Sequence, residues 1–203
     1  MLVIGNGESR RSVDLDLFTC VKIGCNALYR DYRVRHLVCV DRKMVREALD
    51  ANYNNDSLIY TRKCWLDEFS NIKNMRPLPE LPYAGSERYD EPINWNSGPY
   101  AILQALTLSN RGKVFVKDIN IIGFDLYGTS DNKVNNIYKD TNNYSLSRKS
   151  AVDPRYWIIQ IAKLAEEFPQ NNFIFYTTPN WKKPSSWKCK NIVIDKLENL
   201  SYN

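Results

Sequence analysis

The sequence predicts an α/β fold, a Rossmann-like three-layer sandwich around a mostly parallel sheet of six to seven strands. Short apolar runs alternate with stretches of helical spacing, as they do in βαβ units. Several of these runs end at glycine, asparagine or aspartate, which is typical of strands leaving a sheet. A chain of 203 residues suits one domain of this class, so we predict a single domain over residues 1–203.

The strands are predicted from apolar runs that are too short for helices. The first run begins almost at the first residue and stops at Gly5, and the third is apolar until it meets Asp41. The predicted strands span residues 2–4, 18–24, 36–41, 58–60, 120–124, 173–176 and 192–194.

Helices are predicted where apolar residues recur with helical spacing behind a start signal. Asp153 and Pro154 open one such stretch, and Pro99 lies in the first turn of another. The predicted helices span residues 28–32, 43–51, 64–72, 99–109 and 153–168.

Two segments interrupt the alternation of strands and helices. Residues 75–95 are irregular and punctuated by proline, which predicts a long loop. Residues 127–150 are polar and rich in Asn and Lys, which predicts a lid-like loop.

The large aromatic residues divide into two groups. Trp65, Trp157 and Phe168 have helical spacing and are predicted to lie in the core. Trp181 and Trp187 lie in a tail that contains Pro and Lys, where they cover the sheet edge or stack on a sugar. We favour the interpretation that these two residues cover the sheet edge.

Composition narrows the classes of function. The chain has 28 Lys and Arg against 23 Asp and Glu, a net charge of +5 that is too small and too scattered to indicate nucleic-acid binding. Its five cysteines form no CxxC pair, which favours a reducing, cytoplasmic setting without disulfides or a metal site. We predict neither a signal peptide nor a membrane span, because no apolar run is long enough.

The turn after the first strand carries the most specific local signal. Gly5-Asn6-Gly7-Glu8-Ser9 follow the apolar run directly. Gly5 and Gly7 allow positive φ and close approach to the backbone, and Ser9 is a candidate N-cap for a helical turn. Free N–H groups beside a helix N-terminus attract phosphate, so we predict a nucleotide or phosphate ligand here. The alternative is a plain strand-to-helix turn, because the third glycine of the dinucleotide fingerprint is missing.

Polar residues also follow other predicted strands. The carboxyl ends of parallel strands share one edge of the sheet, and ligands bind outside that edge. The residues expected to converge there are Asn6, Asn26, Asp41 and Asp125, joined by Asn96, Ser97 and Gly98 at the start of a helix.

The order of these motifs resembles that of bacterial sialyltransferases, which decorate lipooligosaccharide from CMP-sialic acid. The resemblance implies a nucleotide-binding domain with metal-independent, inverting sugar transfer and no cofactor. The implied partners are a CMP-linked nucleotide sugar and a glycan or small-molecule acceptor. The matching motifs, within roughly residues 1–178, are Gly5-Asn6-Gly7-x-Ser9, Cys25-Asn26, Ser97-Gly98 and Gly123-Phe124-Asp125-Leu126-Tyr127.

The resemblance also implies roles for individual residues. Asp125 is expected near the nucleotide. A tyrosine hydroxyl suits the departing phosphate, because it donates a hydrogen bond to developing negative charge without being charged itself. The residues implied to hold the CMP part are Asn6, Ser9, Asn26 and Ser97. Those implied to stabilise the phosphate are Tyr127, Tyr138 and Tyr144.

Three positions depart from the family pattern. Glu8 replaces a proline beside the expected phosphate site, and Asp41 replaces an amide near the donor. Ser147 occupies the position of the family's general base, a histidine, and the only histidine, His36, is predicted at the opposite end of the third strand. Serine is no base near neutral pH, so Asp125 or Asp41 would have to accept the proton.

Three functions therefore stay open. The first is a nucleotide-sugar-dependent transferase, and the second is a binding protein that kept the nucleotide pocket and lost catalysis. The third is a pterin-alcohol pyrophosphokinase, whose family shares the Gly-x-Gly-x-Ser opening but would need Mg²⁺ and further carboxylates. The oligomeric state is open as well, a homo-oligomer included.

Overall fold

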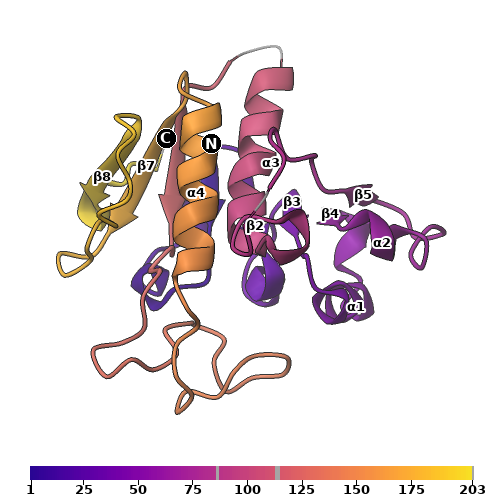
Figure 1. Ribbon diagram of the computed structural model, residues 1–203. Helices are drawn as coiled ribbons and strands as arrows, with labels where there is room; N and C mark the ends of the chain where they lie inside the picture. The colour runs from indigo at the N-terminus through magenta and orange to yellow at the C-terminus, as the bar shows by residue number, and fades with distance from the viewer. Residues whose placement is uncertain (86, 113–114, 203) are drawn as a thin grey trace.

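The computed structural model describes residues 1–85, 87–112 and 115–202, and it confirms the α/β class. Figure 1 shows one sheet with helices packed against it. All neighbouring strands run parallel, in the order β5-β4-β3-β2-β1-β6-β7-β8. The strands are β1 (Leu2–Ile4), β2 (Lys22–Cys25), β3 (His36–Val38), β4 (Leu58–Thr61), β5 (Met75–Pro77), β6 (Asp118–Ile122), β7 (Asn172–Thr177) and β8 (Ile192–Lys196).

The sheet has eight strands, where six to seven were predicted. The additional strand is β5, which lies inside the segment predicted as an irregular loop. Met75 pairs with Ile59 of β4 and is buried, so the start of this segment belongs to the core. The loop itself begins after Pro77, and its residue 86 lies outside the described residues.

Several predicted strands have different bounds in the structure; β3, for example, ends at Val38 and not at residue 41. β2 begins at Lys22 and not at residue 18, because Phe18 is buried outside the sheet against the ring of Tyr202. β6 ends before Gly123, whose φ of +67° turns the chain out of the sheet.

Helices cover both faces of the sheet and complete the three layers. Side chains alternate across a strand, so Val3 packs with α3 and α4 while Leu2 and Ile4 pack with α1 on the other face. Figure 1 shows α3 and α4 side by side on one face. The α-helices are α1 (Arg42–Asp50), α2 (Lys63–Leu66), α3 (Ser97–Arg111) and α4 (Arg155–Glu167). The 3-10 helices are η1 (Glu8–Arg10), η2 (Leu15–Leu17), η3 (Asn26–Arg30), η4 (Tyr53–Asn55), η5 (Pro92–Asn94) and η6 (Leu197–Asn199).

The predicted helix over residues 64–72 is wrong beyond its first turn. After Leu66 the chain continues as three-residue turns, in which Phe69 N–H bonds to Leu66 and Ile72 N–H bonds to Phe69. This spacing keeps Trp65, Phe69 and Ile72 against one apolar cluster, which is the pattern that suggested a helix.

The C-terminal tail covers the sheet, as the favoured interpretation predicted. Trp187 is buried with its ring centroid 4.9 Å from that of Phe175 in β7. Trp181 stacks on the same ring at 6.4 Å. Among the described residues, no helix is both long and apolar enough to cross a membrane.

The backbones of β1 and β6 approach each other too closely for a side chain at Gly5. A Cβ there would lie 2.4 Å from the Gly123 carbonyl oxygen, a backbone atom fixed by the sheet. We expect Gly5→Ala to lower the free energy of unfolding by about 1–3 kcal/mol, the usual cost of forced overpacking. Urea unfolding would measure this loss, as a lower midpoint concentration with an unchanged dependence of the free energy of unfolding on urea concentration.

Gly24→Ala is the matched control for that experiment. Its Cβ would meet the Cδ2 atom of Leu28, the far end of a side chain that can rotate away. We expect a smaller loss than for Gly5→Ala. Equal losses would show that the approach of β1 to β6 carries no special constraint.

Candidate functional site

The chain changes direction across the sheet at β1. Strands β2 to β5 extend from β1 to one edge, and β6 to β8 extend from it to the other. The carboxyl ends of β1 and β6 therefore form the topological switch point, where ligands bind in sheets of this class.

The turn after β1 is joined tightly to the end of β6. The N–H groups of Gly5 and Gly7 donate to the carbonyls of Ile122 and Gly123, each at 2.8 Å. A Cβ at Gly7 would lie 2.4 Å from the carboxylate of Asp125. The two glycines were predicted to allow positive φ and a close approach to the backbone; the close approach is present, whereas the glycine with positive φ is Gly123. Gly5 and Gly7 instead make room for the end of β6.

The carboxylate of Asp125 occupies the place where a phosphate was predicted. Its Oδ2 accepts from the Ser9 N–H at 3.0 Å, and its Oδ1 accepts from the Ser9 hydroxyl. Ser9 therefore does not cap η1, contrary to the prediction, and the N-cap position belongs to Gly7. The Glu8 N–H is also paired, with Asn135 Oδ1 at 3.2 Å. These N–H groups of the turn thus have partners within the protein, and a phosphate ligand at this turn stays a prediction.

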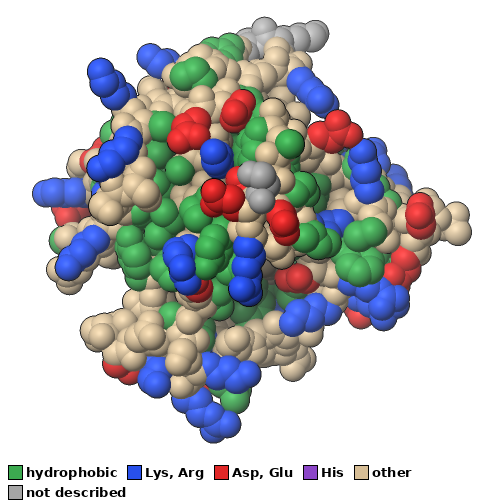
Figure 2. Space-filling model, viewed as in Figure 1, with side chains coloured by type: hydrophobic (Ala, Val, Ile, Leu, Met, Phe, Trp, Pro, Cys, Tyr) green, Lys and Arg blue, Asp and Glu red, His purple; other side chains and the backbone are tan. Residues whose placement is uncertain are grey.

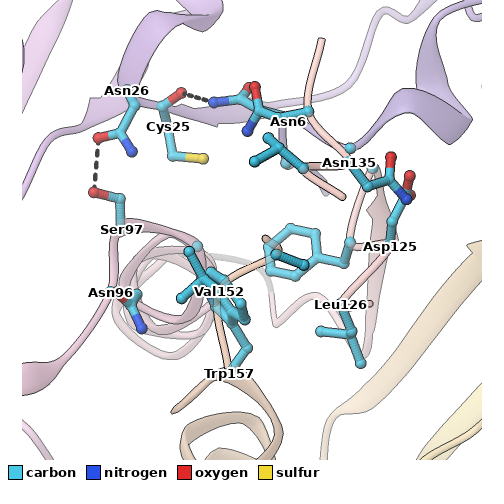
Figure 3. Close-up of a pocket in the computed structure, with 18 of the residues that line it drawn as sticks. Asn6, Cys25, Asn26, Asn96, Ser97, Asp125, Leu126, Asn135, Val152 and Trp157 are labelled. Atoms are coloured by element: carbon cyan, nitrogen blue, oxygen red, sulfur yellow. Dashed lines mark hydrogen bonds between the residues drawn. The ribbon is translucent and has the colours of Figure 1, made fainter. Parts of the chain in front are cut away.

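A cavity of about 280 Å³ lies at the switch point, and Figure 3 shows its polar and apolar sides. All of the predicted site residues except Ser9 and Tyr138 line it. These lining residues are Gly5, Asn6, Gly7, Asn26, Asp41, Asn96, Ser97, Gly98, Asp125, Tyr127 and Tyr144. Residues that are far apart in the sequence thus meet in one small space.

Asn6 lines one side of the cavity (Figure 3). Its side-chain nitrogen donates to the Cys25 carbonyl at 3.1 Å and to the Tyr144 hydroxyl at 3.2 Å. The residue is 8% exposed, and its Oδ1 is buried without a partner among the described residues. An unpaired buried acceptor is costly, and this one has almost no accessible surface, so it is closed off from the cavity.

Asn26 and Ser97 form a second hydrogen-bonded pair in the cavity wall. Ser97 begins α3, accepts from the Val40 N–H at 3.1 Å, and donates to Asn26 Oδ1 at 2.8 Å (Figure 3). Asn26 has a φ of +50°, a conformation that Asn tolerates better than most residues. The wall thus begins where β2 ends and η3 begins.

Tyr138 and Ser9 do not line the cavity. The Tyr138 hydroxyl donates to Asp31 Oδ2 at 2.6 Å and accepts from Arg10 at 3.0 Å. Arg10 is 2% exposed and donates its Nε–H to the Gly5 carbonyl at 2.6 Å. Tyr138 therefore supports the turn after β1, and its ring packs at 5.6 Å from that of Tyr144.

A strained turn aims the residues after β6 at the cavity. Leu126 has a φ of +61°, and the Tyr127 N–H bonds to the Asp125 carbonyl at 2.7 Å. This three-residue turn with positive φ is rare and costly for a branched side chain. It places Leu126 and Tyr127 in the cavity lining while the side chain of Asp125 bonds to Ser9.

The side of the cavity opposite Asn6 and Asn26 is apolar (Figure 3). Trp157, near the start of α4, and Val152 line this side. Trp157 was predicted to lie in the core, and it also packs, partly buried, against the core cluster. The sequence signal that could have placed Trp157 in a cavity lining was its position about one turn after a long polar loop. The amides Asn135 and Asn136 also line the cavity and were not predicted.

The lid-like loop is docked on the protein. The Ile137 N–H donates to the Asn6 carbonyl at 2.9 Å. Arg30 donates to Thr141 Oγ1 at 2.6 Å, and Asn143 donates to Glu47 of α1 at 2.5 Å. These contacts carry Tyr144 into the cavity from a segment without regular secondary structure.

The hydrogen-bond donors in the cavity lining are neutral, and its only charged residues are Asp41 and Asp125. Burial raises the pKa of Tyr127 and of Tyr144, so both phenols stay protonated at neutral pH. Burial raises the pKa of the Cys25 thiol to about 12, which makes it a packing group and no nucleophile. On the face seen in Figure 2, basic and acidic side chains are interspersed.

The only histidine, His36, and the residue at the family's histidine position, Ser147, both lie outside the cavity. His36 begins β3 at the amino end of the sheet, with Nδ1 at 3.0 Å from the Tyr60 hydroxyl, and burial lowers its pKa. Ser147 is absent from the lining, and its N–H donates to Asp140. Within the described part of the chain, no group of three or more His, Cys, Asp or Glu could hold a metal ion.

The position of Tyr138 makes a specific prediction about stability. Tyr138→Phe removes the hydroxyl that satisfies buried Arg10, so we expect a loss of about 1–3 kcal/mol in the free energy of unfolding. Tyr127→Phe is the control, because the Tyr127 hydroxyl has no hydrogen-bond partner among the described residues. Chemical denaturation of both variants measures the difference, and equal effects would contradict the support role of Tyr138.

Comparison with known proteins adds no family to this geometry. No protein-family model, no curated protein and no solved structure matches the chain. The fold is therefore established by the sheet and its helices, and the function has to be argued from the cavity.

Proposed function

We propose that the chain is a sialyltransferase-like glycosyltransferase domain that binds a nucleotide sugar of the CMP type. The observation that carries the proposal is the single cavity at the switch point, with Asn6, Asn26, Ser97 and Tyr144 in its lining. These positions were selected from sequence motifs alone, and a ligand common to them explains why they meet.

The size and chemistry of the cavity support a ligand of this class. Its volume of about 280 Å³ lies just below the usual range of roughly 300–1,000 Å³ for small-molecule sites, which favours a small ligand such as a mononucleotide. Amides and hydroxyls on one side and Trp157 on the other suit a ring with a polar edge. No Lys or Arg lines the cavity, so neutral groups would have to hold the phosphate.

Tyr127 and Tyr144 would stabilise the departing phosphate. Both are protonated at neutral pH, because burial raises their pKa, and both line the cavity. A neutral donor held in place stabilises charge that develops during bond breaking more than it stabilises the ground state. Tyr138 has no such role in this proposal, because its hydroxyl is used by Arg10 and Asp31.

Asp41 is the stronger candidate for the general base. It lies at the start of α1, lines the cavity, and its side chain makes no capping hydrogen bond. Asp125 lines the cavity too, but both of its oxygens accept from Ser9. Taking a proton from an acceptor sugar would cost Asp125 these bonds, whereas Asp41 would lose none.

A nucleotide-binding protein without catalysis is the second candidate. The engagement of Asp125 by Ser9, together with Ser147 in place of a histidine outside the cavity, favours it. The pterin-alcohol pyrophosphokinase is the least supported of the three functions, because phosphoryl transfer of that kind draws on Mg²⁺ held by carboxylates. Asp41 and Asp125 are the only carboxylates in the lining, and Asp125 is already engaged.

Thermal unfolding with CMP, CMP-sialic acid, UDP and GDP tests the nucleotide site. We expect the cytidine nucleotides to raise the melting temperature, since a ligand at 100-fold its Kd adds about 2.7 kcal/mol. Asn6→Ala should abolish the shift, because it removes a polar side chain from the cavity lining and the hydrogen bond that holds Tyr144 beside it. The absence of any shift with all four compounds would refute the proposal.

Donor turnover separates the transferase from the binding protein. If the chain is a transferase, Asp41→Asn should slow transfer or hydrolysis of CMP-sialic acid by about 100-fold or more while the donor still binds. Asp125→Asn is the comparison, and it should mainly lower stability. Binding without any turnover of the donor would assign the chain to the second candidate.

A further inference from the structure

The net positive charge of the chain is concentrated in one short segment between β7 and β8. Residues 181–191, which we call the strap, contain four lysines and no acidic residue. The four lysines are Lys182, Lys183, Lys188 and Lys190. No Asp or Glu occurs anywhere between Glu167 and Asp195. Without the strap the chain has 24 Lys and Arg against 23 Asp and Glu, so its remainder is close to neutral.

Three apolar residues, one at every third position, hold the strap on the protein. Trp181 and Trp187 pack on the same aromatic ring of β7, and Pro184 between them is buried. The indole N–H of Trp181 donates to the Asp125 carbonyl at 3.0 Å, and that of Trp187 donates to the Ile158 carbonyl at 2.9 Å. Because the chain returns to the protein at every third residue, the residues between these anchors face outward.

The lysines of the strap are exposed and lack anionic partners. None of the four forms an ion pair among the described residues. Lys183 Nζ donates to the Ile192 carbonyl at 3.2 Å, which leaves its charge uncompensated. Figure 2 shows basic side chains along the side of the molecule on which β8 lies in Figure 1. Unpaired like charges on one segment repel one another, so the strap is complementary to an anionic surface.

We propose that the strap is a docking surface for the anionic lipid headgroups of a membrane. A lysine ammonium is a compact point charge, which suits a diffuse negative surface without fixed contact points. Each lysine close to such a surface strengthens binding by about fivefold, so four on one segment suffice for docking without a membrane-spanning helix. The proposal is independent of the proposed nucleotide site.

Nucleic acid is the less favoured polyanion for this segment. Single strands are bound through aromatic side chains on which bases stack, and both tryptophans of the strap are turned inward against the sheet. Arginine, whose planar fork pairs with phosphates and with base edges, is absent from the strap. Lysines without these two features fit headgroups better than they fit a nucleic acid.

Sedimentation with lipid vesicles tests the proposal. At low ionic strength we expect the protein to bind vesicles made of phosphatidylcholine and phosphatidylglycerol in equal parts, but not vesicles of phosphatidylcholine alone. Binding should fall as salt is added, because the Debye length shrinks from about 10 Å at 0.1 M to about 3 Å at 1 M. No binding to the anionic vesicles, or equal binding to the neutral ones, would overturn the proposal.

Replacing lysines of the strap by glutamine locates the binding surface. The fourfold variant, Lys182→Gln, Lys183→Gln, Lys188→Gln and Lys190→Gln, should bind the anionic vesicles about 100-fold more weakly or worse. The pair Lys188→Gln and Lys190→Gln alone should cost about 25-fold, which gives a second reading from a smaller change. Melting temperatures check that each variant is folded.

The matched control removes as many charges from exposed residues on the half of the sheet that holds β3 to β5. Its replacements are Arg33→Gln, Lys63→Gln, Lys73→Gln and Arg76→Gln. We expect the control to keep most of the vesicle binding, because its charges lie away from the strap. An equal loss in the control and the strap variant would show that net charge alone drives binding, and it would overturn the role of the strap.

Competition with an oligonucleotide separates lipid from nucleic acid. We expect single- and double-stranded DNA, at the same phosphate concentration as the vesicles, to leave most of the protein bound to lipid. DNA that displaces the protein from the vesicles, and whose binding is lost in the fourfold strap variant, would assign the strap to nucleic acid and overturn lipid docking.

Discussion

The hydrogen bonds from Ser9 to the Asp125 carboxylate set the geometry of the ligand edge of the sheet. They join the turn after β1 to the turn after β6. The two turns lie so close together that no side chain would fit at Gly5 or Gly7. The strained turn at Leu126 follows from this anchoring, because the chain must reverse within three residues to reach the cavity. With the carboxylate in this position, the turn binds an internal anion, and in the proposed function ligand recognition falls to the amides farther along the edge.

The cavity is lined by several separate segments of the chain, and groups outside the cavity hold these segments together. Arg10 links the first turn to Tyr138, and Arg30 and Glu47 link η3 and α1 to the same polar loop. A segment of irregular backbone can be held in place in this way. Hydrogen bonds from charged groups to backbone carbonyls and side-chain oxygens then do what the regular hydrogen bonds of a helix or strand do elsewhere. The result is a site whose donors are neutral although the chain as a whole carries a net charge of +5.

Much of the fold could be predicted from the sequence, because apolar periodicity and strand-end residues are local signals. The class, the parallel sheet and most of the strands follow from them. β5 could not be found, since Met75 is the one buried residue of its three and proline ends it. The helix after Lys63 was overextended, because three-residue turns place apolar residues on one side much as a helix does.

The candidate site could be predicted only as far as residue identity indicates position. Asn6, Asn26 and Ser97 were found because they end a strand or begin a helix. The pairing of Ser9 with Asp125 could not be, because it depends on how two distant turns approach each other. Trp157 was missed because a helical aromatic on the rim of a cavity has the same spacing as one in the core.

The position of β1 at the centre of the sheet has a consequence for folding during synthesis. β1 leaves the ribosome before the other strands of the sheet and finds one neighbour, β2, within about twenty residues, as the register of Leu2 with Lys22 shows. Its other neighbour, β6, begins at Asp118, so one edge of the central strand stays open until all the residues between them have been made. The nascent chain therefore carries a wholly apolar strand with an open edge while most of the sheet is being made, and a chaperone that shields short apolar segments would find a binding site at β1.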